Sequence, residues 1–153
     1  MIMNFFTIST FRQSVASLLK KRKDGYNSVV QDICDALNEM PDDIIRESND
    51  RVYQYPEYRV VKLRLPNSGL RLSKANGCRL IYWVSLKHDN VALLRVYPKR
   101  GSQGIVDLTQ SEYRRLQLEL FNQSQANMLH QVDITNALSE LSTSATLSAI
   151  AVK

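Results

Sequence analysis

The sequence predicts one α+β domain, in which an N-terminal helical hairpin packs on a mostly antiparallel sheet of about four strands and a further helix follows. Three observations support this fold class. Apolar residues recur at helical spacing before residue 40, alternate with polar residues between 58 and 97, and return to helical spacing after Thr109. With 153 residues, 44% of them hydrophobic, the chain is long enough to bury one core. We expect the domain to span residues 1–125 and residues 126–153 to form a tail.

Two helices are expected before the sheet. The apolar face of the first consists of Phe11, Val15, Leu18 and Leu19. It ends in the basic run 20–23, where cations suit the negative end of the helix dipole. The second helix begins near Ser28 and stops before Pro41, and the short connection between the two predicts an antiparallel hairpin. Residues 41–57 are expected to be irregular or edge-like, because Pro56 does not fit a central strand.

Three strands follow, at residues 60–65, 78–86 and 91–97. In the first, alternation directs Val61, Leu63 and Leu65 to the core and the cations between them to the other face. The second and third are joined by the turn 87–90, which contains His88, and form a hairpin. A helix is expected from Thr109, because Glu112 three residues later completes a capping box.

The tail is rich in Ser, Thr and Ala, and we expect it to lie outside the main fold. One short helix is predicted at 134–141, because Ile134, Leu138 and Leu141 share a helical face. Asp133 is placed to cap this helix.

Positive charge is concentrated in the predicted sheet. Residues 58–100 contain ten Lys or Arg and one acidic residue, a net charge of +9, whereas the whole chain carries +5. Such a surface repels itself unless an anion binds it, and nucleic acid is the common anion with closely spaced charges.

Other classes of function have less support in the sequence. No apolar run approaches the roughly 20 residues of a membrane span, and the N-terminus does not resemble a secretory signal, so we expect a cytoplasmic protein without a membrane partner. Cys34 and Cys78 have neither metal-binding nor disulfide-framework spacing and are expected to be reduced core residues. With only His88 and His130 besides, we expect no metal site and no cofactor.

The segment KLRLPNSGLRLSKANGCRLIYWV, followed by LLRVYPKR, resembles the core signature of the RelE/ParE superfamily of bacterial type II toxins. The nearest branch is that of the RelE/HigB-like, ribosome-dependent mRNA interferases. The matching motifs are the pair Lys62 and Arg64, the stretch 77–82 (GCRLIY) and the stretch 97–100 (YPKR). In the order of elements, the resemblance extends over about residues 8–121, and the tail matches nothing known in the family.

The resemblance implies a toxin that cleaves mRNA in the ribosomal A site and is held inactive by a cognate antitoxin. In this reaction the 2′-OH of the substrate attacks the adjacent phosphate, leaving a 2′,3′-cyclic phosphate and a 5′-OH. No metal is required if cations stabilise the negative charge of the transition state and two groups move the protons. The implied partners are therefore the antitoxin, the ribosome and mRNA.

The resemblance also implies which residues act. The catalytic candidates are Lys62, Arg64, Arg79 and Arg100. Lys62 and Arg64 fall on the paired cations of the first core strand, with Lys62 as the candidate base. Arg79, in the Gly-x-Arg strand, and Arg100, after the third strand, are expected to clamp phosphate oxygens. General RNA contacts are expected at Arg71, Lys74 and Lys99.

The sequence leaves several alternatives open. The family often has a tyrosine after the Lys-Arg pair, but here GSQGIVDL follows, so the proton donor for the leaving group is unassigned. The candidates are Ser102, Gln103, Asp107, Tyr97 and Tyr113. From strand alternation alone, Lys62 and Arg64 can also be the solvated face of an amphipathic strand. Two other functions remain open: a ParE-like gyrase poison, although that branch generally lacks these clustered cations, and a catalytically inactive RNA-binding or partner-binding relic.

Overall fold

The computed structural model describes residues 3–21, 24–101 and 103–135. It is an α+β structure built on a six-stranded mixed sheet with the strand order β2-β3-β4-β5-β1-β6. The strands are β1 (Asn4–Thr7), β2 (Arg51–Gln54), β3 (Tyr58–Leu65), β4 (Cys78–Ser85), β5 (Asn90–Pro98) and β6 (His130–Val132). The helices are α1 (Ser9–Lys20), α2 (Val29–Glu39), α3 (Asp42–Arg46) and α4 (Gln110–Gln125), with a short 3-10 turn at Ser68–Leu70.

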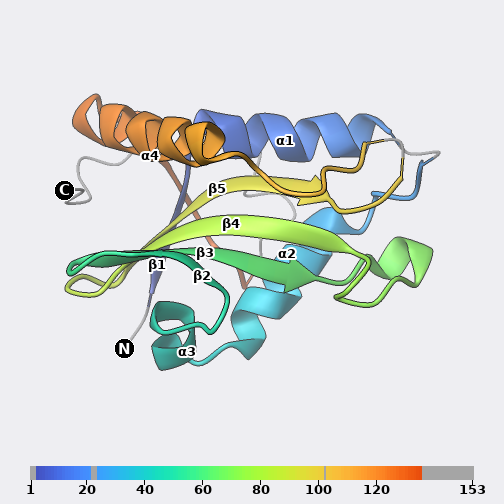
Figure 1. Ribbon diagram of the computed structural model, residues 1–153, viewed down its shortest axis with the longest axis horizontal. Coiled ribbons are helices and arrows are strands. Elements are labelled where there is room, and N and C mark those ends of the chain that lie inside the picture. Colours follow the sequence, from blue (N-terminus) through green and yellow to red (C-terminus); the bar gives the residue numbers. More distant parts are fainter. Residues whose placement is uncertain (1–2, 22–23, 102, 136–153) are drawn as a thin grey trace.

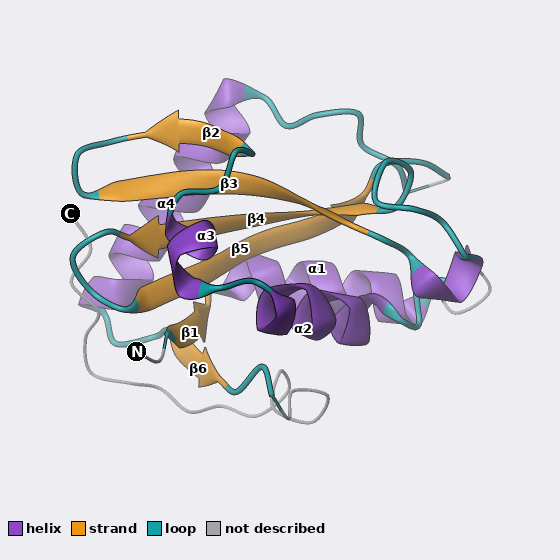
Figure 2. Ribbon diagram, turned by 90° about the horizontal axis from the view of Figure 1, so that it is seen from below, coloured by secondary structure: helices purple, strands orange, loops and turns teal. Residues whose placement is uncertain are grey.

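The expected α+β class is confirmed, but the arrangement of the helices differs from the expected hairpin on one face. Figure 1 shows α1 and α4 above the sheet and α2 and α3 below it, and the view from below in Figure 2 agrees. On the upper face, α1 and α4 are tied together by the hydroxyl of Thr10, which donates to Glu119 Oε1 (2.5 Å). The central strand β4 is consequently covered on both sides, and all eight of its residues are buried.

Two strands of the sheet were not expected from the sequence. β1 pairs in parallel with β5, with Phe5 opposite Val91, and β6 pairs antiparallel with β1, with Phe5 opposite Val132. Because β6 lies after residue 125, part of the segment expected as a tail belongs to the sheet. Of the helix expected at 134–141, residues 136–141 lie outside the described residues.

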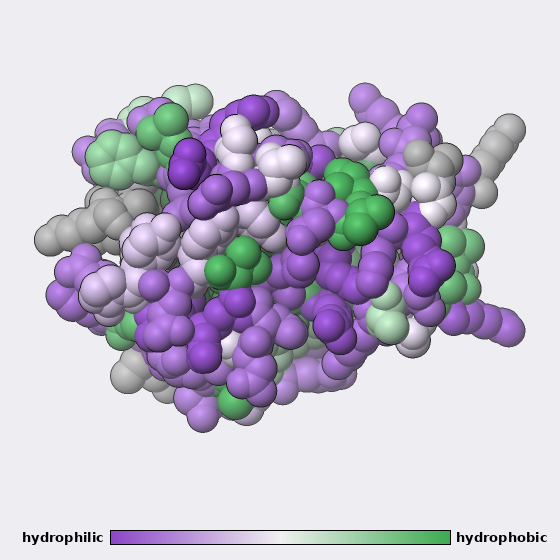
Figure 3. All heavy atoms as spheres, viewed as in Figure 1, coloured by the Kyte–Doolittle hydropathy of each residue, from purple (hydrophilic) through white to green (hydrophobic). Residues whose placement is uncertain are grey.

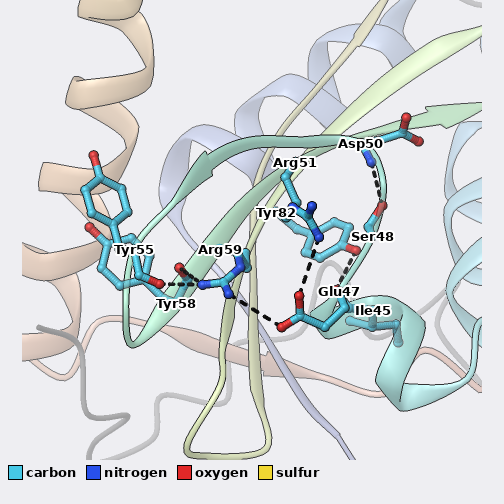
Figure 4. A network of polar contacts seen from close by, with 9 residues as sticks. All are labelled: Ile45, Glu47, Ser48, Asp50, Arg51, Tyr55, Tyr58, Arg59 and Tyr82. Atoms are coloured by element: carbon cyan, nitrogen blue, oxygen red, sulfur yellow. Dashed lines mark hydrogen bonds and ion pairs between the residues drawn. The ribbon is translucent and has the colours of Figure 1, made fainter.

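The segment 41–57 is more regular than expected. It contains α3 and then β2, which is an edge strand, and Pro56 lies beyond the end of β2. Figure 4 shows how α3 is fixed beneath the sheet: the Tyr82 hydroxyl donates to the carbonyl of Ile45 (2.9 Å). Arg59 forms an ion pair with Glu47 (3.6 Å) and donates to the carbonyls of Tyr55 and Tyr58.

Helix α1 also covers part of one strand edge. β1 pairs with β5 only as far as Leu93, so the last part of β5 has no strand beside it on that edge. There the backbone N–H of Val96 donates to Ser14 Oγ (3.1 Å), and the Ser14 hydroxyl donates to the carbonyl of Phe11 (2.7 Å). A serine side chain therefore replaces a neighbouring strand at this point.

Helix α4 begins as the sequence predicts. The Thr109 side chain accepts from the Glu112 backbone N–H (3.1 Å), and Glu112 Oε1 accepts from the Thr109 backbone N–H (3.0 Å). Cys34 and Cys78 are free and buried, in agreement with the expected core thiols. Within the described residues, no helix combines the length and apolar character of a membrane span.

Candidate nucleic-acid-binding site

The pairing of β3, β4 and β5 brings the predicted cations of these strands together. Across β3 and β4, Lys62 lies opposite Ile81 and Arg64 lies opposite Arg79. Across β4 and β5, Arg79 lies opposite Tyr97 and Ile81 lies opposite Arg95. Directly opposed residues project from the same face of a sheet. Lys62, Arg64, Arg79, Arg95 and Tyr97 therefore share one face, which we call the cationic face.

The cationic face is the one that α4 covers. Arg95 forms an ion pair with Glu112 in the first turn of α4 (3.1 Å). Tyr58, which shares the alternation of Lys62 along β3, donates its hydroxyl to Gln117 of α4 (3.3 Å). The connection that leads from β5 to α4 returns above the sheet, as Figure 1 shows.

Lys62 is half-buried and contacts that connection. Its ammonium group lies 3.4 Å from a carboxylate oxygen of Asp107, and the two side chains are 32% and 58% exposed. An ion pair this exposed contributes little to stability, on the order of 0–1 kcal/mol. Asp107 also accepts from the backbone N–H of Leu108 (2.8 Å), which holds its carboxylate in place. A phosphate group can therefore compete with Asp107 for Lys62 at little cost.

Arg64 and Arg79 have different environments although they are directly opposed. Arg64 is exposed and forms no ion pair with any described residue. Arg79 is only 5% exposed. Its guanidinium donates to the carbonyls of Lys74 (2.9 Å), Cys78 (3.0 Å) and Ala75 (3.1 Å). Burial lowers the pKa of Arg79, and the positive charge of Arg64 lowers it further.

The contacts of Arg79 give it a structural role that the sequence did not predict. Three carbonyl groups from residues 74–78 converge on one side chain, which fixes the connection between β3 and β4 against the sheet. The expectation that Arg79 also clamps a phosphate oxygen stays a prediction. Arg64, opposite Arg79 and exposed, is the better-placed cation for a bound anion.

The remaining predicted cations lie around the same end of the sheet, where β3 and β5 end and β4 begins. Arg71 and Lys74 are exposed in the connection between β3 and β4, and Arg71 has a left-handed backbone conformation (φ 55°). Lys99 follows β5, and its backbone N–H donates to the carbonyl of Gly77 (3.0 Å). Arg100 is exposed and lines a small pocket of about 200 Å³ with Asn76 and other residues of this end. Arg100 thus follows the strand end and is not part of the strand face.

Two buried tyrosines lie at the cationic face: Tyr97 belongs to it, and Tyr113 is in the helix α4 that covers it. Tyr97 is 2% exposed and Tyr113, in α4, is 4% exposed. Both hydroxyl groups are buried, and neither has a hydrogen-bond partner among the described residues. Burial raises the pKa of Tyr97 to about 12, with a further rise from the charge of Asp107. Burial likewise raises the pKa of Tyr113, with smaller effects from Tyr97 and Asp107.

Arg95 is the residue of this face that the sequence reasoning did not select. Its side chain is 25% exposed, and its guanidinium carbon lies 5.8 Å from the centre of the Tyr97 ring. The available signal was its position as the single charged residue in an otherwise apolar strand. Tyr97 and Tyr113 were among the open candidates for the proton donor, and both lie here.

Other conspicuous residues have structural surroundings. Trp83 is 3% exposed, and its ring centre lies 5.7 Å from that of Tyr58, so it belongs to the core. His88 is exposed in the β4–β5 turn, where its backbone N–H donates to Ser85 Oγ (2.9 Å). In the view of Figure 3 the surface is mainly hydrophilic, with apolar side chains in small separate patches.

A scan against protein-family models and searches of curated proteins and of solved structures found no match for this chain. The resemblance to the RelE/ParE superfamily therefore rests on the motifs in residues 60–100 and on the order of elements over about residues 8–121.

Proposed function

We propose that this protein is the toxin of a type II toxin–antitoxin system and acts as a ribosome-dependent mRNA endoribonuclease. The observation that carries the proposal is the strand register that aligns Lys62, Arg64 and Arg79 on one face of the sheet. A cluster of cations on a rigid sheet is what cleavage by the substrate's own 2′-OH needs, because it stabilises the extra negative charge of the transition state.

The proposed roles follow from exposure and contacts. Arg64 is exposed and serves as the main electrostatic contact to the scissile phosphate. Lys62 is held 3.4 Å from Asp107 and is the candidate base once that carboxylate has moved away. Arg79 holds the connection at residues 74–78 in place, and its positive charge adds to the electrostatic attraction of the cationic face for phosphate. The exposed cations Arg71, Lys74 and Arg100, together with Lys99, contact the RNA backbone.

The order of elements also supports a RelE-like fold. Two helices precede a cationic strand, and two further strands carry the Gly-x-Arg and Tyr-Pro-Lys-Arg motifs. In this proposal the common part is α1, α2 and β3–β5, to which β1, β2, β6 and α3 are joined. A cytoplasmic location follows from the proposed substrate.

The proposed regulator is a cognate antitoxin that neutralises the cationic face. The net charge of +9 in residues 58–100 favours an acidic or amphipathic segment, a helix or an added strand laid across α1 and α2 or the sheet edge. Co-expression with the product of the neighbouring gene is expected to yield a complex that weakens at high salt.

The test is primer extension on mRNA after induction, with cleavage in a purified translation system as the quantitative assay. Arg64→Ala is expected to lower the cleavage rate about 10²–10³-fold, because it removes a charge at the phosphate. Arg51→Ala is the matched control: it removes an arginine from the edge strand β2, where the side chain pairs with Glu47 (3.4 Å). Cleavage that is unchanged in Arg64→Ala but lost in Arg51→Ala would place the site elsewhere. Inhibition of DNA gyrase without mRNA cleavage would support the ParE-like function instead.

A further inference from the structure

The two unpartnered tyrosine hydroxyls of the cationic face carry an inference beyond the proposed activity. A buried polar group without a hydrogen bond is rare in folded proteins, because its loss of contact with water is not compensated. Here two such groups occur, at Tyr97 and Tyr113, and they are close enough for Tyr97 to raise the pKa of Tyr113. They come from different elements, β5 and α4, that meet over the same face of the sheet.

We propose that the hydroxyls of Tyr97 and Tyr113 bind an oxygen of the RNA phosphate group, and that the ligand supplies their missing hydrogen-bond acceptor. The inference rests on the proposed function for the identity of the ligand. The binding of an oxyanion here is inferred from the two hydroxyl groups and from the cations of the cationic face.

The surroundings of Tyr97 point to an anion. Tyr97 lies opposite Arg79 in the strand register, and the Arg95 guanidinium lies over its ring at 5.8 Å. The Tyr113 ring is held by an edge contact with Tyr53, with 5.4 Å between the ring centres. Both rings are therefore positioned by neighbours that do not occupy their hydroxyl groups. Cations attract the anion to this face, and the hydroxyls contribute directional hydrogen bonds.

The protonation state of the hydroxyls suits this role. Because burial raises the pKa of both groups, they stay neutral at physiological pH and keep a proton to donate. A neutral O–H donor can bind a phosphate oxygen or the leaving 5′-oxygen without adding charge. This pair therefore accounts for the donor that the residues after Arg100 do not supply.

Asp107 occupies the neighbourhood of the proposed oxyanion in the unliganded protein. Its carboxylate pairs with Lys62 and raises the pKa of both tyrosines. A bound phosphate repels the Asp107 carboxylate and competes with it for the Lys62 ammonium group. The Asp107 side chain is 58% exposed, and its displacement breaks the ion pair with Lys62 and the hydrogen bond from the Leu108 backbone N–H (2.8 Å).

The test uses Tyr→Phe substitutions, which remove only the hydroxyl oxygen. In wild-type protein, inorganic phosphate is expected to raise the melting temperature, because the ligand binds only the folded chain. Tyr97→Phe and Tyr113→Phe are expected to lose most of this shift and to lower the mRNA cleavage rate about 10²-fold. Without phosphate, both variants are expected to melt at or above the wild-type temperature, because no hydrogen bond is lost.

Tyr82→Phe is the matched control. Tyr82 is fully buried in the same sheet, but its hydroxyl donates to the carbonyl of Ile45 (2.9 Å) on the opposite face. This variant is expected to melt below the wild type and to keep both the phosphate shift and cleavage.

The outcomes separate the inference from the proposed function. If Arg64→Ala abolishes cleavage while both Tyr→Phe variants at the cationic face cleave and bind phosphate like wild type, the inference fails and the function stands. If wild type cleaves no mRNA but the phosphate shift depends on Tyr97 and Tyr113, the oxyanion site stands and the function fails. If both variants melt below wild type, as is expected of Tyr82→Phe, the hydroxyls are structural and the inference is overturned.

Discussion

Replacing Arg79 by alanine tests whether this side chain acts mainly on the fold or on the substrate. The guanidinium is 5% exposed and donates three hydrogen bonds to the carbonyls of Lys74, Ala75 and Cys78. Hydrogen bonds from a charged group contribute about 1.5–3 kcal/mol each. Water can replace the bonds at Lys74 and Ala75, which are exposed, and the cost of burying the charge disappears with the side chain. The expected net loss is about 2–3 kcal/mol.

For a chain of this length, that loss lowers the melting temperature by about 5–10 °C. Thermal unfolding followed by circular dichroism measures the effect, and cleavage is assayed in parallel at 25 °C, where the variant remains folded. Arg64→Ala provides the contrast. It relieves repulsion between two opposed cations and is expected to melt at or above the wild-type temperature. If Arg79→Ala melts like wild type and cleaves no mRNA, the structural role assigned to Arg79 is refuted.

Two further predictions concern the fold. Truncation after Gln125 is expected to lower the melting temperature, because it removes β6 and the buried residues Leu129 and Val132. Truncation after Thr135 keeps these residues and serves as the control. Equal melting temperatures of the two truncated proteins would contradict the role of β6. Burial raises the pKa of Cys34 and Cys78 from 9.0 to about 11, so the stabilisation from each neutral thiol is complete below pH 9 and is lost as pH rises through 11. Each contributes at most about 3 kcal/mol. Urea unfolding from pH 8 to 11 should show this decline, and a Cys34→Ala/Cys78→Ala double variant should show a smaller one; equal slopes would refute the assignment.

The elements with a strong local pattern were predictable. β3, β4 and β5 lie where the alternating runs predict strands, because the apolar residues of the sheet are concentrated in these three adjacent strands. Helix α4 begins at the predicted cap, Thr109, because a capping box is a purely local interaction. In each case the sequence within one element contains the whole signal.

The elements that depend on long-range pairing were not predictable. β1 has four residues and β6 has three, which is too short for a periodic pattern, and both are defined by partners far along the chain. The placement of α1 and α2 on opposite faces was missed for a related reason. An amphipathic helix shows that one of its sides is buried, but not which face of the sheet it covers.

The candidate site also combines features that a local sequence pattern predicts with features that depend on the tertiary structure. Alternation along one strand places Lys62 and Arg64 on a common face, so their proximity could be predicted. The burial of Arg79 depends on how residues 74–78 fold over its side chain, and no local pattern encodes that. The meeting of Tyr97 with Tyr113 depends on where α4 lies, so the sequence could name both residues without bringing them together.

The contact between Ser14 and the end of β5 restricts how another chain can join the sheet. An incoming strand needs a row of free backbone groups, and at Val96 the N–H already donates to the serine hydroxyl (3.1 Å). Strand addition beside the last part of β5 would therefore require α1 to move away. The outer edges of β2 and β6 are the two ends of the described sheet. A regulator that binds by adding a strand would then bind at the outer edge of β2 or β6. Only other segments of that regulator could contact the cationic face.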